Sequence, residues 1–251
     1  MSTVKTIVNA DDLGLSPDVN RAIFDLIDRG RVTSATLMAN APAIEEAAKA
    51  LKQFPRASFG VHLNLTEFAA LAPTPGLAPI LGADGRFNDN IRRIRLDGRT
   101  KQAILTEWCA QIDRLRALGV TLSHFDSHHH VHTVAGLFPV LKTLQSRYGV
   151  RKVRATRNLY DAGQKLRPGL RQAKGVWNMA LRHIYATRTT EMFTSLESFH
   201  SQVSHGYRPA GTIELMVHPG NKDFVDETSL LAGPWIETVE PKLKLISYHE
   251  L

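Results

Sequence analysis

Short runs rich in β-branched residues alternate with segments of helical periodicity along this chain of 251 residues. The first run, Val4 to Asn9, leads into Ala10 without a polar stripe, as expected of a strand buried on both faces. Ser16 and Pro17 then give an N-cap and a first-turn signal, and an apolar helical face follows as far as Gly30. Strands that alternate with helices are typical of a parallel sheet, which is either open or closed into a barrel.

The same reading predicts the remaining elements. Further strands are expected at residues 32–40, 57–66, 120–125, 150–155, 193–196, 211–217 and 244–248, and helices at 43–54, 100–118, 137–147, 176–185 and before Pro241. Residues 67–99 break the pattern with closely spaced Pro and Gly, which predicts a long loop that acts as a lid, a binding loop or a disordered insertion. The length of the chain suits one α/β barrel or two smaller domains.

Polar side chains cluster where the predicted strands end. They are Asp11 and Asp12 after the first strand, His62 and Asn64 after the third, Asp126 and His128 after the fourth, and His218 after the strand at 211–217. Any one of them alone could be a helix cap, a core histidine or a turn residue. In a β/α barrel, however, the carboxyl ends of the strands share one face, so we expect these residues to converge there.

The densest cluster is the stretch from Asp126 to His132, which holds one carboxylate and four imidazoles within seven residues. If the stretch is helical, His128 and His132 can meet one ion, and if it is extended, His128, His130 and His132 share a face. A solvated loop or a set of core histidines is the ordinary alternative. So many imidazoles together favour a metal or catalytic site.

Composition excludes several classes of protein. The formal charge is +7 and the pI about 9.7, but Lys and Arg are mostly scattered without an aromatic-basic repeat, so we expect no nucleic-acid partner. The single Cys109 forbids an internal disulfide and suits a reducing compartment. The chain shows neither a leader segment nor an apolar run of membrane-spanning length, which predicts a cytoplasmic protein with no membrane partner.

Three motifs carry a resemblance to a known family. Residues 8–16 (VNADDLGLS), 60–66 (GVHLNLT) and 124–132 (HFDSHHHVH) resemble the motifs of the YdjC-like family, which includes chitooligosaccharide deacetylase. The resemblance runs in register over residues 4–155 and continues more loosely through residues 214–220 (ELMVHPG). It implies one domain over residues 1–251, with the loop at 67–99 inserted. It also implies a TIM-like β/α barrel, distorted or seven-stranded, related to polysaccharide deacetylases.

By the same resemblance, Asp12, His62 and His128 hold a divalent metal and Asp11 is the base. Two imidazoles and one carboxylate would leave room at a cation for water and a substrate carbonyl, as amide hydrolysis requires. Zn²⁺ suits the nitrogen donors, whereas Mg²⁺ or Mn²⁺ suits an oxygen ligand with several waters.

The other polar residues receive roles from the chemistry. His218 is the candidate acid for the leaving amine, and Asp126 is a candidate acceptor behind a ligand imidazole. His132 is either a third metal ligand or a contact to substrate, and Asn64 stands among the residues expected near substrate or ligands.

The expected function is therefore a metal-dependent carbohydrate N-deacetylase acting on an N-acetylated sugar. A hydrolase of another amide or ester, and a sugar-binding protein that needs a metal but has no turnover, are the alternatives. The expected partner is a small carbohydrate, and a homodimer is left open.

Overall fold

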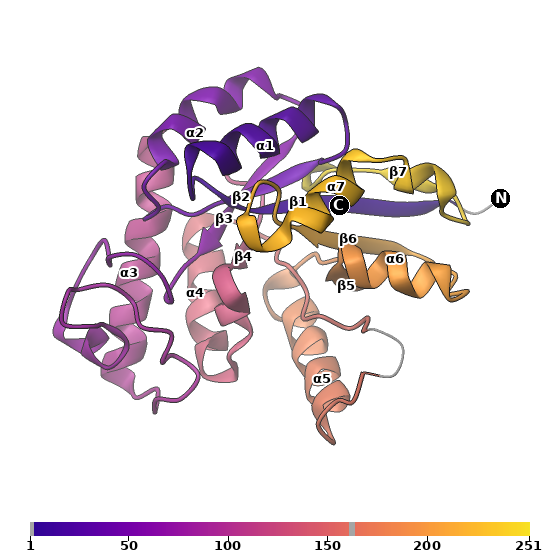
Figure 1. Ribbon diagram of the computed structural model, residues 1–251. Helices are drawn as coiled ribbons and strands as arrows, with labels where there is room; N and C mark the ends of the chain where they lie inside the picture. Colours follow the sequence, from indigo (N-terminus) through magenta and orange to yellow (C-terminus); the bar gives the residue numbers. More distant parts are fainter. Residues whose placement is uncertain (1–2, 161–163) are drawn as a thin grey trace.

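The computed structural model describes residues 3–160 and 164–251. In these ranges seven strands form one parallel sheet in the order β4-β3-β2-β1-β6-β5, and β7 pairs with the beginning of β1 (Figure 1). The strands are β1 (Val4–Leu13), β2 (Ser34–Leu37), β3 (Ser58–Leu63), β4 (Phe125–Ser127), β5 (Met192–Ser195), β6 (Thr212–Val217) and β7 (Leu243–Leu245). The sheet curls, and helices pack around its outside (Figure 1).

The main helices follow the order of the sequence. They are α1 (Pro17–Asp28), α2 (Ile44–Ala50), α3 (Gly98–Ala117), α4 (Phe138–Tyr148), α5 (Leu170–His183), α6 (Leu196–Ser204) and α7 (Val225–Ala232). Helix α1 begins as its sequence predicts, because the Ser16 side chain accepts a hydrogen bond from the Val19 amide and Pro17 occupies the first turn. Its apolar face, which includes Ile23 and Leu26, is buried in the core.

The expectation of a β/α barrel is confirmed in a distorted form. The two edges of the sheet, β4 and β5, are connected by residues 151–158, which were expected to hold a full strand at 150–155. Instead, this segment makes isolated parallel bridges from Val153 to Phe125 and from Lys152 to Arg188. The Asn158 amide then donates to the Phe193 carbonyl at 3.2 Å. The barrel is therefore closed by a few hydrogen bonds rather than by a regular eighth strand.

Two other predicted strands have different bounds. The fourth was expected over residues 120–125, but β4 covers only Phe125–Ser127. The first continues beyond Asn9 as far as Leu13, so Asp11 and Asp12 lie inside the strand rather than after it. Nearly all of β1 is buried, which agrees with a central strand covered on both faces.

The segment between β3 and α3 is anchored to the molecule rather than open. A short 3-10 helix, η2 (Pro75–Ile80), lies within it, and Leu77, Ile80 and Phe87 are buried in the main core. The Glu107 carboxylate on α3 accepts hydrogen bonds from the backbone amides of residues 71 and 72, at 3.1 and 2.6 Å. The idea of a disordered insertion is therefore wrong.

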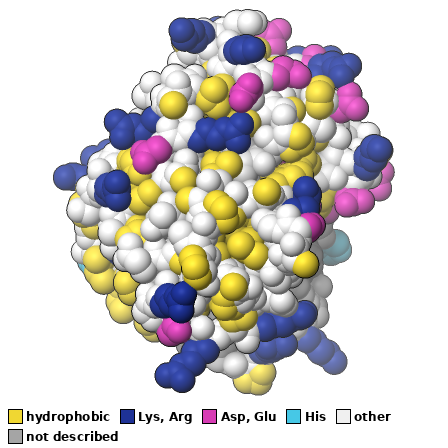
Figure 2. Space-filling view, turned by 90° about the vertical axis from the view of Figure 1, so that its left-hand side faces the viewer, with side chains coloured by type: hydrophobic (Ala, Val, Ile, Leu, Met, Phe, Trp, Pro, Cys, Tyr) yellow, Lys and Arg dark blue, Asp and Glu magenta, His cyan; other side chains and the backbone are white. Residues whose placement is uncertain are grey.

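Figure 2, which shows the side of the molecule at the left of Figure 1, has hydrophobic atoms exposed between separated Lys and Arg side chains.

The end of the chain fills the amino-terminal end of the barrel. After β7, the Tyr248 amide donates to the hydroxyls of Ser34 and Ser58, at the first residues of β2 and β3. The Tyr248 hydroxyl donates to Glu214 at 2.5 Å, and its ring stacks on His124. Within residues 3–160 and 164–251, no helix is long and apolar enough to cross a membrane.

Candidate metal centre

Two adjacent carboxylates near the end of β1 face the inside of the barrel. Successive strand residues normally point to opposite faces. Here the pairing of β1 with β2 shifts register between Ala10 and Leu13, and Asp12 has a left-handed backbone with φ of 66°. The chain therefore leaves the regular pleat at Asp12. Both Asp11 and Asp12 therefore approach the same imidazole, that of His62.

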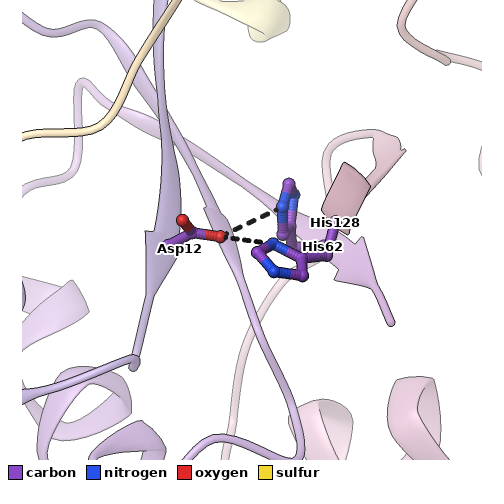
Figure 3. Close-up of side chains that lie close together, drawn as sticks. All are labelled: Asp12, His62 and His128. Carbon is purple, nitrogen blue, oxygen red and sulfur yellow. Dashed lines mark hydrogen bonds and ion pairs between the residues drawn. The ribbon is translucent and has the colours of Figure 1, made fainter. Parts of the chain in front are cut away.

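Asp12, His62 and His128 lie together, as Figure 3 shows. One carboxylate oxygen of Asp12 is 3.3 Å from Nε2 of His62 and 2.9 Å from Nδ1 of His128. All three residues are buried, and each offers one ligand atom within 4.8 Å of the others. They come from β1, β3 and the residue after β4, so the carboxyl ends of three strands meet here.

A second group with metal-ligand spacing, formed by Asp11, His62 and Asp126, overlaps the first. Its two carboxylates both contact the guanidinium of Arg154, at 2.6 Å from Asp11 and 2.9 Å from Asp126. Because a positive side chain already lies between them, a cation would be repelled from this group. One carboxylate oxygen and two imidazole nitrogens make the Asp12 group the better fit to a divalent metal.

The histidine stretch adopts neither geometry that its spacing suggested. It forms a short 3-10 element, η3 (His128–Thr133), in which His129 and His130 have left-handed backbone, with φ of 49° and 55°. His132 consequently turns away from His128. Its Nδ1 contacts the Ser127 hydroxyl and its Nε2 faces the Arg154 carbonyl at 3.3 Å. His132 is fully buried and lies outside the metal-ligand group.

Arg154 is the charged centre of the barrel interior. It is fully buried and donates two hydrogen bonds to Asp11, at 2.7 and 2.6 Å, and one to Glu214, at 2.8 Å. Sequence reasoning missed both Arg154 and Glu214. The available signal was the charge itself, because each residue lies inside a segment that was predicted to be a strand.

These contacts shift the pKa values of the cluster. Burial opposes ionisation of Asp11, but the charge and hydrogen bonds of Arg154 outweigh it and hold the pKa of Asp11 well below its usual range. Burial likewise opposes ionisation of Asp12, and hydrogen bonds with His128 and His62 lower its pKa. Burial disfavours charged His62, yet Asp126 and Asp11 raise its pKa to about 10. Both carboxylates are therefore ionised at neutral pH.

His218 follows β6 and lies beside the cluster. Its Nδ1 is 3.6 Å from the buried Glu227 carboxylate, and its ring stacks on Phe224. Burial disfavours the charged ring, but Glu227, Asp11 and Asp12 outweigh it and raise the pKa of His218. Glu227 was not singled out from the sequence, where it appears only as one acidic residue of a predicted helix.

The two remaining predicted residues are Asp126 and Asn64, and only the first contacts the cluster. Asp126 is buried, and its carboxylate contacts Nδ1 of His62 at 2.8 Å. Asn64 does not reach the cluster; its side chain holds the following turn by accepting from the Thr66 amide and donating to the Glu67 carbonyl. That turn places the Glu67 carboxylate 3.1 Å from Nε2 of His128, a contact which the sequence analysis did not foresee.

The fold and this cluster define a class of protein, namely β/α barrels with a candidate divalent-metal site at the carboxyl ends of the strands. The profile of the YdjC-like protein family matches residues 5–240, and the chain belongs to that family. The resemblance seen in its motifs is thereby confirmed.

Relatives in the family are similar over nearly the whole chain. A protein named carbohydrate deacetylase from Halalkalibacterium halodurans is 32% identical over 236 residues, which cover 93% of this chain and 91% of the relative. A protein of the same name from Listeria monocytogenes is 31% identical over 246 residues, covering 97% and 90%. The crystal structure of a protein from Enterococcus faecalis V583 aligns with 99% of both chains at a TM-score of 0.78 and 23% identity, which shows the common fold.

Proposed function

We propose that this protein is a metal-dependent carbohydrate deacetylase that removes the acetyl group from an N-acetylated sugar. The names of relatives that match more than 90% of the chain support the reaction class. The observation that carries the proposal is the buried group of Asp12, His62 and His128, with Asp11 beside it and His218 next to both. Amide hydrolysis requires an activated water, a stabilised oxyanion and a proton for the leaving amine.

Asp12, His62 and His128 would hold the metal. A divalent cation bound there supplies a Lewis acid for the amide carbonyl and lowers the pKa of the attacking water. Two imidazole nitrogens favour Zn²⁺, whereas the Asp12 oxygen together with water also suits Mg²⁺. Elemental analysis of the purified protein identifies which of them is bound.

Asp11 is the proposed proton acceptor. Its Oδ1 accepts hydrogen bonds from Asn9 and Arg154, whereas Oδ2 accepts one from Arg154 and lies 4.0 Å from Nε2 of His62. Oδ2 is therefore the oxygen with a lone pair directed to the site. The low pKa of Asp11 keeps it ionised at neutral pH but makes it a poor store for a proton. The proton must then pass on during the same turnover.

His218 is the proposed donor to the leaving amine. Its raised pKa, caused by Glu227, Asp11 and Asp12 against the effect of burial, favours the protonated ring near neutral pH. A protonated imidazole is a suitable acid for an amine that departs from a tetrahedral centre. The pair thus divides the work: an ionised carboxylate accepts a proton, and a charged imidazole donates one.

The test is acetate release from a panel of N-acetyl sugars by protein purified with its metal. We expect release by the native protein, and none above background after His62→Ala or His128→Ala, both of which should also lose bound metal. His200→Ala, which alters a histidine of helix α6 outside the metal-ligand group, is the control. Sugar binding without any acetate release would leave the alternative of a non-catalytic sugar-binding protein, and release from other amides or esters alone would contradict the proposed substrate class.

A further inference from the structure

We propose that Glu67 positions His128 in the metal centre, by accepting a hydrogen bond from Nε2–H so that Nδ1 faces the cation. This inference rests on the proposed metal site. It assigns a role to a residue that lies just after β3, at the start of the segment that precedes α3.

The ring of His128 lies between two carboxylates. Nδ1 is 2.9 Å from Oδ1 of Asp12, and Nε2 is 3.1 Å from Oε2 of Glu67. The same Asp12 oxygen is approached by Nε2 of His62 at 3.3 Å. Nδ1 of His128 and Nε2 of His62 are therefore the two nitrogens that converge on one point. The opposite nitrogen of each ring faces away from that point.

Each outward nitrogen meets a carboxylate. Nδ1 of His62 contacts Asp126 at 2.8 Å, which is the usual arrangement behind a metal-bound histidine. For Nε2 of His128, the corresponding carboxylate is Glu67. This nitrogen is buried, and within residues 3–160 and 164–251 no acceptor meets it with full hydrogen-bond geometry. The Glu67 oxygen is the carboxylate oxygen close enough to serve as that acceptor. Because neutral imidazole carries a single N–H, an acceptor at Nε2 leaves the lone pair on Nδ1.

The backbone of Glu67 is held in place by two asparagines. Asn64 accepts from the Glu67 amide at 3.2 Å and donates to its carbonyl at 2.6 Å. Asn40 donates to the same carbonyl at 3.1 Å. The next residue, Phe68, has a left-handed backbone with φ of 60°, which turns the chain away from the site. This anchoring lowers the conformational entropy that is lost when the Glu67 carboxylate is held at one ring nitrogen.

The two supporting carboxylates differ in exposure. The Asp126 side chain is fully buried and is fixed by Arg154, whereas the Glu67 side chain is 46% exposed. Replacing Glu67 should therefore disturb the metal centre without removing a buried charge from the barrel. This difference makes the proposal testable with little risk to folding.

The first measurement is the affinity for Zn²⁺ or Mg²⁺, obtained by competition with a chelator at pH 7.5. For Glu67→Ala we expect binding about 10- to 100-fold weaker, the usual effect of losing an acceptor behind a ligand histidine. Glu67→Gln keeps an acceptor without the charge and should recover part of the loss. Glu45→Ala, which removes an exposed glutamate paired with Arg114, should bind like the native protein. Melting temperatures of the metal-free variants verify that folding is unchanged.

The second measurement is the ¹⁵N NMR spectrum of the Zn²⁺-loaded protein, with the His128 signals assigned by through-bond correlations in the native protein. We expect Nδ1 to be metal-bound and Nε2 to carry the proton, and we expect these signals to broaden or shift in Glu67→Ala. Coordination through Nε2, or a variant with native affinity and spectrum, would overturn the role of Glu67 while leaving the metal site intact. A native protein that binds no metal would instead overturn the proposed function and this inference together.

Discussion

The guanidinium of Arg154 donates hydrogen bonds to both carboxylate oxygens of Asp11, at 2.7 and 2.6 Å, in the interior of the barrel. The same side chain also contacts Asp126 and Glu214, so one buried cation is shared by three buried carboxylates. Removing one partner of a buried ion pair leaves charges without compensation, which is far more costly than losing a pair at the surface. Arg154 therefore holds the carboxylates behind the candidate metal centre in place.

Arg154→Met should lower the free energy of unfolding by about 3–5 kcal/mol, because three carboxylates then lose their buried counter-charge. Urea denaturation in the presence of EDTA measures this without a contribution from metal. The matched control is Arg114→Met, which breaks an exposed pair with Glu45 and should cost less than about 1 kcal/mol. Equal effects in the two variants would show that Arg154 is not the main counter-charge of the interior.

Asp11→Asn and Asp12→Asn should separate proton transfer from metal binding. Asp12→Asn is expected to weaken metal affinity, whereas Asp11→Asn should retain the metal while acetate release falls by roughly 10²- to 10⁴-fold, as for loss of a general base. The alternative that Asp11 caps the first helix is wrong, because Ser16 performs that role. Metal content and turnover are measured on the same preparations. Native turnover in Asp11→Asn would remove this carboxylate from the proposed mechanism.

Acid should destabilise the fold partly through His132. Burial and the nearby Arg154 lower the pKa of His132 to about 3, whereas an unfolded histidine titrates near pH 6.5. Between these values the unfolded state binds a proton that the folded state does not, so stability is lost as the pH falls from about 6.5 toward 3.

The change from pH 6.5 to 5.5 should cost about 1 kcal/mol through this one group. His132→Gln should be less stable than the native protein at pH 7.5. Between pH 6.5 and 5.5, however, its free energy of unfolding should fall by about 1 kcal/mol less than that of the native protein. Urea denaturation at pH 6.5 and 5.5, with EDTA present, provides the comparison. Equal losses of unfolding free energy in the two proteins would show that groups other than His132 cause the acid sensitivity.

The segment at 67–99 should contribute to folding as well as to the site. For an ordinary surface loop, shortening the segment between Ala72 and Phe87 would affect catalysis more than stability, because surface loops carry little core. The burial of Leu77, Ile80 and Phe87 contradicts that premise, so the deletion should unfold the protein.

A point substitution tests the same contribution. Leu77→Ala should cost about 2–5 kcal/mol, the usual range for a buried leucine. Val225→Ala, at a position that is 62% exposed, should change stability by no more than about 0.5 kcal/mol. Denaturation curves of the two variants give the two free energies of unfolding. A Leu77→Ala protein as stable as the control would show that the segment is a surface loop that contributes little to folding.

Local sequence patterns were enough to predict the architecture and the main cluster. Alternating periodicities predicted the parallel sheet and its helices, because each element must bury one apolar face and the period reveals which face that is. The carboxyl ends of parallel strands lie at one end of a barrel, so Asp12, His62 and His128 could be expected to meet although they are far apart in the chain.

Features that depend on one backbone angle or on one distant partner could be seen only in the folded protein. The left-handed angles of Asp12, His129 and His130 redirect side chains in ways that spacing does not encode, and they separate His132 from His128. Arg154 meets Asp11 across 143 positions of sequence. Such a charge can be buried only where counter-charges from other strands surround it. The local sequence pattern does not indicate which distant residues those partners are. The contact of Glu67 with His128 is likewise set by a turn that two asparagines hold.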